Sequence, residues 1–240
     1  HVLGAFALAL LGLAGFVWIE LHTTVPLINV AMFKQRMLAV ALATAVFSAL
    51  LAHPIALAAP LYLQNVIGAN ALTAGFVLAT LPLSTALASP ISGRLADRFD
   101  AGTMTAIGMA LILAGIVAYS RLGTRSDFST VVAVLALLGA GIGVFTPANQ
   151  KIAFASVAQE DYGVLAAMLS SFGTAAGTIG TTLTVALMEL RGGGALWQDP
   201  KALAGAQQFA FAWLAPFGLL AVGIAIKSRP ENKIETIAKS

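Results

Sequence analysis

The sequence predicts an all-α polytopic membrane protein with seven transmembrane helices. Of its 240 residues, 59% are hydrophobic and only 10% are charged, and the mean hydropathy of +0.90 lies above the range of soluble domains. The apolar residues form runs of membrane length, because no Asp, Glu, Lys or Arg occurs from Met37 to Gly93 or from Met104 to Ser120. Strand-like alternation is missing, which argues against a β-barrel.

A spanning helix needs about 20 consecutive apolar residues, within a range of roughly 17–25. Seven segments of the chain meet this requirement. In chain order the predicted spans are Val2–Ile19, Leu38–Leu63, Leu72–Ile91, Met104–Ser120, Val131–Pro147, Val164–Met188 and Phe209–Ile226.

The first span stands apart from the other six. A longer connection follows it, whereas the six later spans are more evenly spaced. We therefore divide the chain into an extra transmembrane helix with a cytoplasmic connection (1–37), a six-helix bundle (38–226) and a disordered, charged cytoplasmic tail (227–240). Residue 1 is His and an apolar run begins at once, so we expect the sequence to be part of a longer protein.

The distribution of Lys and Arg predicts the orientation in the membrane. Nine of these residues lie on one side, in segments 20–37, 92–103, 150–163 and 227–240, and four lie on the other. Cytoplasmic connections carry the excess of positive charge. We therefore expect the C-terminus in the cytoplasm of a multi-pass protein of the cell membrane.

The residue content excludes several classes of site. There is no cysteine, so disulfides, thiol catalysis and Cys-ligated zinc are excluded. No P-loop, zinc-protease or nucleophile-elbow motif occurs. The net charge of +3 comes from single basic residues at the ends of apolar runs, which is typical of contacts with lipid headgroups rather than with nucleic acid. We expect no enzyme activity, no cofactor and no metal site.

His53 is the one titratable residue near the middle of a predicted span. Such groups are costly in lipid and mark functional sites. Pro54 removes a backbone N–H and bends the helix there. Gln64 lies eleven positions on, within about 20° of His53 on a regular helix. We interpret both as lining a substrate cavity; the alternative is a histidine bonded to a neighbouring helix.

The span Val131–Pro147 and the residues after it carry small and polar residues at helical spacing. These residues are Gly139, Gly143, Thr146, Asn149 and Gln150. One interpretation is a helix that lines the transport path and reaches substrate with its polar end. The other, which we favour, is close helix packing through the glycines together with an ordinary membrane–water boundary at the polar end.

The span Val164–Met188 carries a stripe of glycine and hydroxyl residues. Its glycines are Gly173, Gly177 and Gly180, and its hydroxyl residues are Ser170, Thr174, Thr181 and Thr184. Hydroxyl groups can bond to their own helix backbone, so this stripe need not face water. We predict that it packs against another helix.

The segment Gly93-Arg94-Leu95-Ala96-Asp97-Arg98 places a compact cluster of charge between two apolar runs. We predict a tight loop on one membrane face. This segment resembles the cytoplasmic loop motif G-x-L-a-D-R of the major facilitator superfamily. There it links the second and third helices of each six-helix half, and it holds the same place in the bundle predicted here. This sequence departs from the family pattern at two positions: Asp100 stands where the family usually has Gly, and Ala101 where the family usually has a basic residue.

Other stretches resemble the fourteen-helix drug:proton antiporters of that superfamily, the EmrB/QacA-type exporters. The stretches that carry the resemblance are Pro26–Lys34, Leu61–Gly68, Ala71–Gly75, Gly139–Gly143 and Gly173–Gly180. The resemblance implies that the chain is the C-terminal half of a secondary transporter, and that its first span is one of two extra helices between the halves.

The resemblance further implies proton-coupled efflux of drugs or other amphipathic compounds by alternating access. The partners would be the lipid bilayer, the N-terminal half of the same transporter, a small amphipathic substrate and protons. Gly93, Arg94, Asp97 and Arg98 would form a cytoplasmic latch that favours one state. The membrane-embedded carboxylate that such exporters need is expected in the other half, because no Asp or Glu lies in the middle of a predicted span.

Two alternatives remain open at this stage. Seven spans would also suit a receptor-like protein, although a receptor does not explain the loop motif, and the last span lacks the Lys that a retinal protein needs. A half-transporter that works as a homodimer is the second. An intramembrane enzyme is disfavoured, because no catalytic pair can be assembled within the spans.

Overall fold

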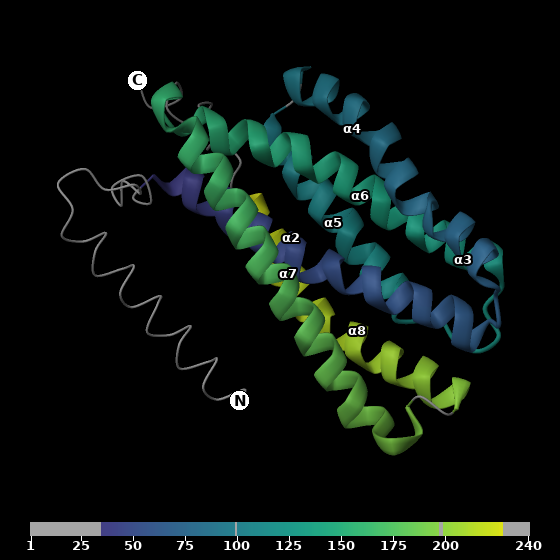
Figure 1. Ribbon diagram of the computed structural model, residues 1–240. Helices are drawn as coiled ribbons and strands as arrows, with labels where there is room; N and C mark the ends of the chain where they lie inside the picture. Colours follow the sequence, from purple (N-terminus) through teal and green to yellow (C-terminus); the bar gives the residue numbers. More distant parts are fainter. Residues whose placement is uncertain (1–34, 99, 197–198, 228–240) are drawn as a thin grey trace, which may run out of the picture.

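The computed structural model describes residues 35–98, 100–196 and 199–227, which form a bundle of long antiparallel helices (Figure 1). Short helical turns and loops join the helices. The elements are α2 (Arg36–Leu61), a π-helical turn (Tyr62–Val66), α3 (Ala71–Leu78), α4 (Thr80–Arg98), α5 (Ala101–Tyr119), α6 (Phe128–Ala155), a 3-10 turn (Gln159–Asp161), α7 (Tyr162–Gly192), a second 3-10 turn (Gly193–Ala195) and α8 (Pro200–Ile226).

Six helical segments are long and apolar enough to cross a membrane. They confirm the predicted all-helical membrane class, and the described residues contain no strand. The six spans predicted between 38 and 226 each correspond to one of these segments. The predicted span Val2–Ile19 and the residues after Lys227 lie outside the described residues, so the count of seven stays a prediction.

Three helices begin at an aspartate that the hydropathy pattern does not reveal. Asp100, Asp127 and Asp199 are the N-caps of α5, α6 and α8, and each carboxylate accepts a hydrogen bond from a backbone N–H of the first turn. Pro200 follows at the first position of α8, where its missing N–H costs nothing. The caps explain why α6 and α8 begin earlier than the apolar runs predicted.

The prediction of a tight loop at Gly93–Arg98 is wrong. Helix α4 continues to Arg98, so the motif forms its last turns and only residues 99 and 100 lie between α4 and α5. Arg, Leu and Ala are good helix formers, and nothing in the segment breaks the backbone hydrogen bonding. The charges therefore mark where a continuous helix emerges from the apolar region.

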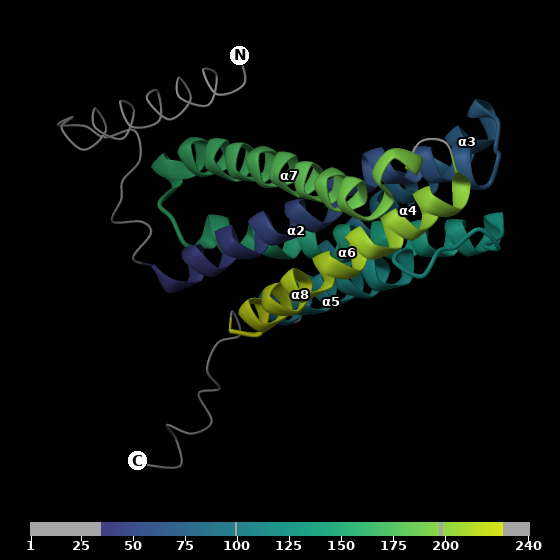
Figure 2. The ribbon, with the colours of Figure 1, turned by 90° about the horizontal axis from the view of Figure 1, so that it is seen from below.

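Helices α4, α5 and α6 form one group, and α7 lies apart from it. Helices α2 and α8 connect α7 to that group. Helix α6 packs along both α4 and α5, whereas α2 packs chiefly on α7, and α8 fills the space between α5, α7 and α2. Figure 2 shows α2 lying between α7 and α6. Helices α6 and α7 touch only marginally, so one face of the bundle stays open between them.

Glycines let the helices approach closely at two crossings. A Cβ on Gly139 or Gly143 of α6 would collide with the carbonyl oxygen of Leu81 or Thr85 on α4. The Thr85 hydroxyl also donates to the Gly139 carbonyl oxygen, at 3.0 Å. Gly180 of α7 has the same relationship to the backbone of α2. Close approach of this kind is the usual role of small residues between membrane helices.

At the far end of α2 a polar and aromatic cluster joins α2, α5 and α8. Tyr119 stacks at a tilt on Phe211, with ring centroids 4.5 Å apart, and its hydroxyl hydrogen-bonds Gln207 Oε1 at 3.2 Å. Gln207 Nε2 donates to the carbonyl oxygen of Ala58 at 3.0 Å, and the Tyr62 hydroxyl donates to the α5–α6 loop. These buried groups are satisfied within the protein, as a membrane interior requires.

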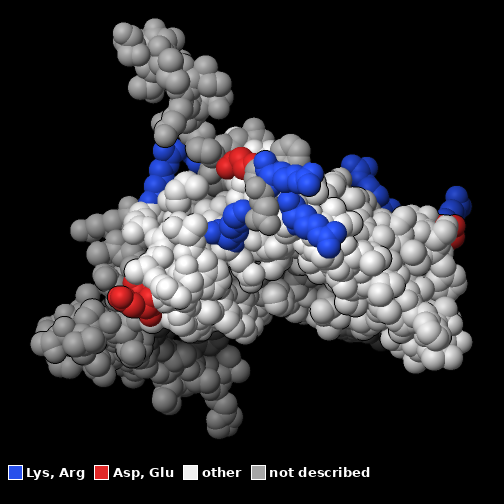
Figure 3. Space-filling view, turned by 90° about the horizontal axis from the view of Figure 1, so that it is seen from above, with Lys and Arg blue, Asp and Glu red and all other residues white. Residues whose placement is uncertain are grey.

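Large apolar side chains cover much of the outer surface. On α3 and α4 the exposed ones are Leu72, Phe76, Leu83, Leu87, Ile91 and Leu95. Figure 3 shows Lys and Arg side chains gathered along part of the face seen from above, while most of that face carries no charge. An apolar surface of this extent fits lipid better than water.

Candidate substrate cavity

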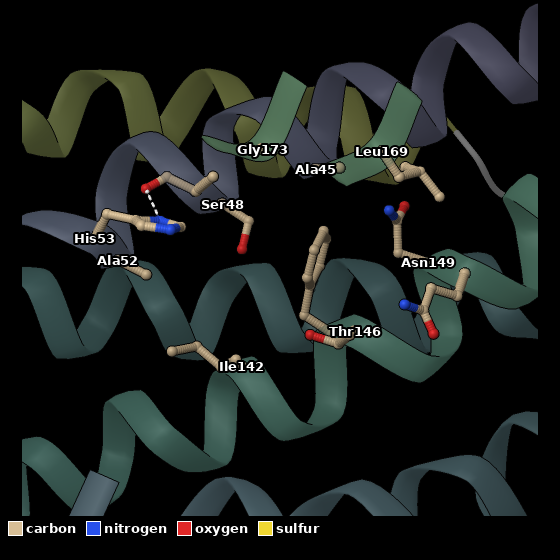
Figure 4. Close-up of a pocket in the computed structure, with 12 residues that line it drawn as sticks. Ala45, Ser48, Ala52, His53, Ile142, Thr146, Asn149, Leu169 and Gly173 are labelled. Atoms are coloured by element: carbon tan, nitrogen blue, oxygen red, sulfur yellow. Dashed lines mark hydrogen bonds between the residues drawn. The ribbon is translucent and has the colours of Figure 1, made fainter. Parts of the chain in front are cut away.

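A cavity of about 380 Å³ lies between α2, α6 and α7, on the open face of the bundle (Figure 4). Its volume falls within the range of small-molecule sites. Small side chains of α2 form one wall, α6 forms the facing wall, and α7 contributes Leu169 and Gly173. The lining residues of the first two helices are Ala45, Ser48, Ala49, Ala52 and His53 on α2, and Ile142, Phe145, Thr146, Asn149 and Gln150 on α6.

Interhelical contacts bound the cavity at both ends. At one end Asn149 of α6 joins α2, because its Nδ2 donates to the Ala41 carbonyl oxygen at 3.0 Å and its Oδ1 accepts from Thr44 at 2.9 Å. At the other end the ring of His53 lies against Gly177 of α7. The space between these contacts stays hollow because α2 presents mostly alanines there.

Asn149 has a different role from the one expected. It was predicted to reach substrate beside Gln150, but only 3% of its surface is exposed and its amide is already bonded to α2. Gln150 is exposed and Thr146 is half-buried, so both can reach a ligand in the cavity. Asn149 therefore has a structural role: its hydrogen bonds hold α6 against α2 at the edge of the cavity.

His53 lies at the edge of the cavity, with its ring pointing into it (Figure 4). Its Nδ1 is 3.0 Å from the carbonyl oxygen of Ala49, one turn earlier in the same helix. A Cβ on Gly177 would lie only 2.5–2.7 Å from the Cγ, Cδ2 and Nδ1 atoms of the ring. The glycine therefore provides the space that the imidazole fills.

Gln64 does not join His53 at the cavity. It lies in the π-helical turn Tyr62–Val66, is exposed, and is not among the lining residues. Eleven residues of helix separate the two by about 16 Å along the axis, so a shared helix face does not bring them together.

Gly173 differs from the other glycines that were predicted to pack. No atom lies within 4 Å of the position that its Cβ would take, and it lines the cavity instead. Helices α6 and α7 make few contacts with each other, and Gly173 lies where α7 borders the cavity between them.

Sequence reasoning missed Ser48 and Phe145 as lining residues. Ser48 projects toward the cavity from α2 (Figure 4) and is itself almost buried. The signal was present: Ala45, Ser48, Ala49, Ala52 and His53 follow the spacing of one helix face. What the sequence lacked was the identity of the helix opposite that face.

The Gly93–Arg98 motif is tied to α6 rather than to the cavity. Lys151 Nζ donates to the Ala96 carbonyl oxygen at 2.7 Å, and the Ser92 hydroxyl donates to the Val144 carbonyl oxygen at 2.8 Å. A lysine at a helix C-terminus satisfies carbonyl groups that lack intrahelical partners. Arg94 and Arg98 are exposed, and the side chain of Asp97 lies outside the described residues.

The cavity is uncharged apart from one ionisable ring. No Lys, Arg, Asp or Glu is among its lining residues, and His53 is the one titratable group that they include. Within the described part of the chain, no group of three or more His, Cys, Asp or Glu side chains is placed to hold a metal ion. The site is thus suited to binding a small molecule by apolar contacts and a few hydrogen bonds.

The family model of the Major Facilitator Superfamily matches residues 37–239. The chain belongs to the major facilitator superfamily. The match covers all six described spans, and it places the chain in a family of multi-pass membrane transporters rather than of enzymes, as predicted. It also decides against the seven-helix receptor.

Several curated proteins are similar to the chain. It is 25% identical to the multidrug transporter protein MdtP of Bacillus subtilis over 82% of its own length, and 25% identical to the lincomycin resistance protein LmrB of Listeria monocytogenes over 78%. It is 29% identical to the tetracenomycin C resistance and export protein of Streptomyces glaucescens over 80%. The chain spans only 36–39% of the length of these three relatives.

Proposed function

We propose that this chain is the C-terminal half of a proton-coupled exporter of drugs or other amphipathic compounds in the cell membrane. One observation carries the proposal: the uncharged cavity between α2, α6 and α7 opens on the face where α6 and α7 separate. A cavity with one open side needs a second wall. Relatives whose names describe drug transport or antibiotic resistance are about twice as long as this chain or longer, which leaves room for another bundle.

In the proposed mechanism the two halves rock about the shared cavity. Transporters built from repeated halves bind substrate near the middle of the membrane, between the halves, and expose the site to each side in turn. The residues of this half that would contact substrate are His53, Thr146 and Gln150, together with Ser48 and Phe145. Apolar walls with few polar groups fit amphipathic molecules of differing shape.

The proton pathway is proposed to use a carboxylate of the complementary half. Glu189 lies in the last turns of α7 and no acid lines the cavity. Proton-driven transport commonly uses Asp, Glu or His chains within the membrane. His53 is the one cavity residue of this half able to take part in such a chain.

We propose that the ends of α4 and α6 face the cytoplasm. This follows from the excess of Lys and Arg in the connections on that side of the membrane. There the Gly93–Arg98 motif would bias the equilibrium between states. An exposed ion pair contributes about 0–1 kcal/mol, which shifts a balanced equilibrium without fixing it.

Drug accumulation in an efflux-deficient bacterium tests this proposal. The chain alone is compared with the product of a reading frame extended upstream of His1, each with and without a protonophore. We expect only the extended product to exclude drug, and the protonophore to abolish the exclusion. Exclusion by the 240 residues alone would favour the homodimeric half-transporter instead, and exclusion that persists with the protonophore would contradict proton coupling.

A further inference from the structure

The imidazole of His53 has one nitrogen that the protein uses and one that it leaves open. Nδ1 is bonded to the Ala49 carbonyl oxygen at 3.0 Å, whereas Nε2 has no hydrogen-bond partner among the described residues. The ring atoms nearest the Cβ position of Gly177 are Cγ, Cδ2 and Nδ1, so the Nε2–Cε1 edge lies farther from this glycine. Figure 4 shows the ring directed from α2 into the cavity.

The bond to Ala49 determines the tautomer of the neutral ring. A carbonyl oxygen can only accept, so Nδ1 must carry the proton that it donates. In a neutral imidazole the other nitrogen then has a lone pair and no proton. Nε2 is consequently a hydrogen-bond acceptor at the edge of the cavity, held in place by Ala49 on one side and Gly177 on the other.

The other polar lining groups are less selective. The hydroxyls of Ser48 and Thr146 and the amide of Gln150 can each donate or accept, and they adapt to either kind of ligand group. The amide of Asn149 is already occupied by α2. His53 Nε2 is thus the one side-chain group among the cavity's lining residues that can accept a hydrogen bond without also donating one.

We propose that His53 Nε2 is a specificity determinant that favours amphipathic substrates with an N–H or O–H donor, such as amines and phenols, over analogues without one. The inference rests on the proposed transport function and names the substrate class of the same cavity. A neutral hydrogen bond contributes about 0.5–1.5 kcal/mol, so the expected preference is about 2- to 12-fold.

Two substitutions separate the nitrogens of the ring. The side-chain amide of His53→Asn can reproduce the Nδ1 donor but reaches no farther, whereas the carbonyl oxygen of His53→Gln can reproduce the Nε2 acceptor. The probes are a neutral aminocoumarin dye and its N,N-dimethyl analogue, which lacks the N–H donors. Fluorescence titration of the purified exporter in lipid nanodiscs measures the affinity for each dye, with drug accumulation by each variant as the functional control.

We expect the wild-type protein and His53→Gln to prefer the aminocoumarin, and His53→Asn to bind both dyes equally. Equal binding by the wild-type protein, binding of neither dye, or an unchanged preference in His53→Asn would each overturn the assignment. Nitrogen NMR of histidine-labelled protein provides an independent test, because a protonated Nε2 in the neutral ring would contradict the tautomer whatever the transport result. Drug exclusion that persists while the dye preference fails would leave the exporter proposal standing.

Discussion

The carbonyl oxygen of Leu50 on α2 occupies the space that a Cβ on Gly180 of α7 would need, so no side chain would fit there. Pro54, four residues after Leu50, has no N–H to donate to this carbonyl. The gap in the helical hydrogen bonding and the absent Cβ therefore occur at the same crossing. A weak Cα–H contact to the free carbonyl is the kind that recurs between helices in close approach.

Replacing Gly180 with Ala should lower the stability of the bundle. The new methyl group would meet backbone rather than a flexible side chain, and overpacking of this kind costs about 1–3 kcal/mol. Thermal unfolding in detergent and the yield of monodisperse protein measure the effect. Gly163→Ala is the matched control, because its Cβ would have no atom within 4 Å. Equal behaviour of the two variants would show that α2 and α7 do not approach so closely.

Replacing Asn149 with Leu should loosen α6 from α2. The change removes both hydrogen bonds between the helices and leaves the Ala41 carbonyl without its amide donor. Hydrogen bonds between membrane helices contribute about 0.6–1.7 kcal/mol, so we expect a loss of about 1 kcal/mol. Denaturant titration in mixed micelles provides the measurement. Thr44→Val should have a smaller effect, because it keeps the bond from Asn149 to Ala41; a larger loss in Thr44→Val would contradict this interpretation.

Replacing Asp97 with Asn should impair transport while leaving membrane insertion intact. The motif is proposed to bias the balance between states, and an exposed pair contributes about 1 kcal/mol or less, which is about a fivefold change in that balance. Drug efflux and membrane abundance are measured together. Lys151→Met, which removes the donor to the Ala96 carbonyl oxygen, should weaken efflux in the same direction. Unchanged efflux in Asp97→Asn would refute the latch.

The carboxylate of Asp127 should remain ionised in acid. Hydrogen bonds from the hydroxyls of Ser129 and Thr130 and from the backbone N–H of Thr130 lower its pKa from 3.8 to about 2. Because the folded pKa is depressed, the stability that the cap contributes is fully present above pH 3.8 and is lost as the pH falls through about 2. Infrared difference spectra of wild-type protein and Asp127→Asn should show the carboxylate band persisting at pH 3; its loss between pH 5 and 4 would contradict the capping geometry.

The sequence predicted the helices well where hydropathy alone decides them, and less well where a cap or a partner helix does. Six apolar runs matched six helices. Asp127 and Asp199 extend α6 and α8 beyond those runs, because capping depends on where the backbone turns and not on hydropathy. The segment Gly93–Arg98 is helical although the sequence predicts a loop, because a cluster of charge marks the edge of the membrane and not necessarily the end of a helix.

The site was predictable in part for the same reason. His53 stands out as a polar residue in an apolar span, and the structure places it on one cavity with Thr146 and Gln150, although their roles stay predictions. The sequence alone does not show which polar side chains will form hydrogen bonds to a neighbouring helix. The amide of Asn149 is bonded to α2, and Gly173 has no neighbour because it borders the cavity between α6 and α7.

The hydroxyl groups of α7 have a consequence for substrate range. Thr174, Thr178, Thr181 and Thr184 each donate to a carbonyl oxygen four residues earlier in α7, so none of these bonds links α7 to a neighbour. Sliding or tilting of α7 would leave all four of these hydroxyls satisfied, because each moves together with its acceptor. If the cavity binds substrate as proposed, the wall that α7 forms could shift for a bulkier guest without leaving any of these four hydroxyls unsatisfied in the membrane interior.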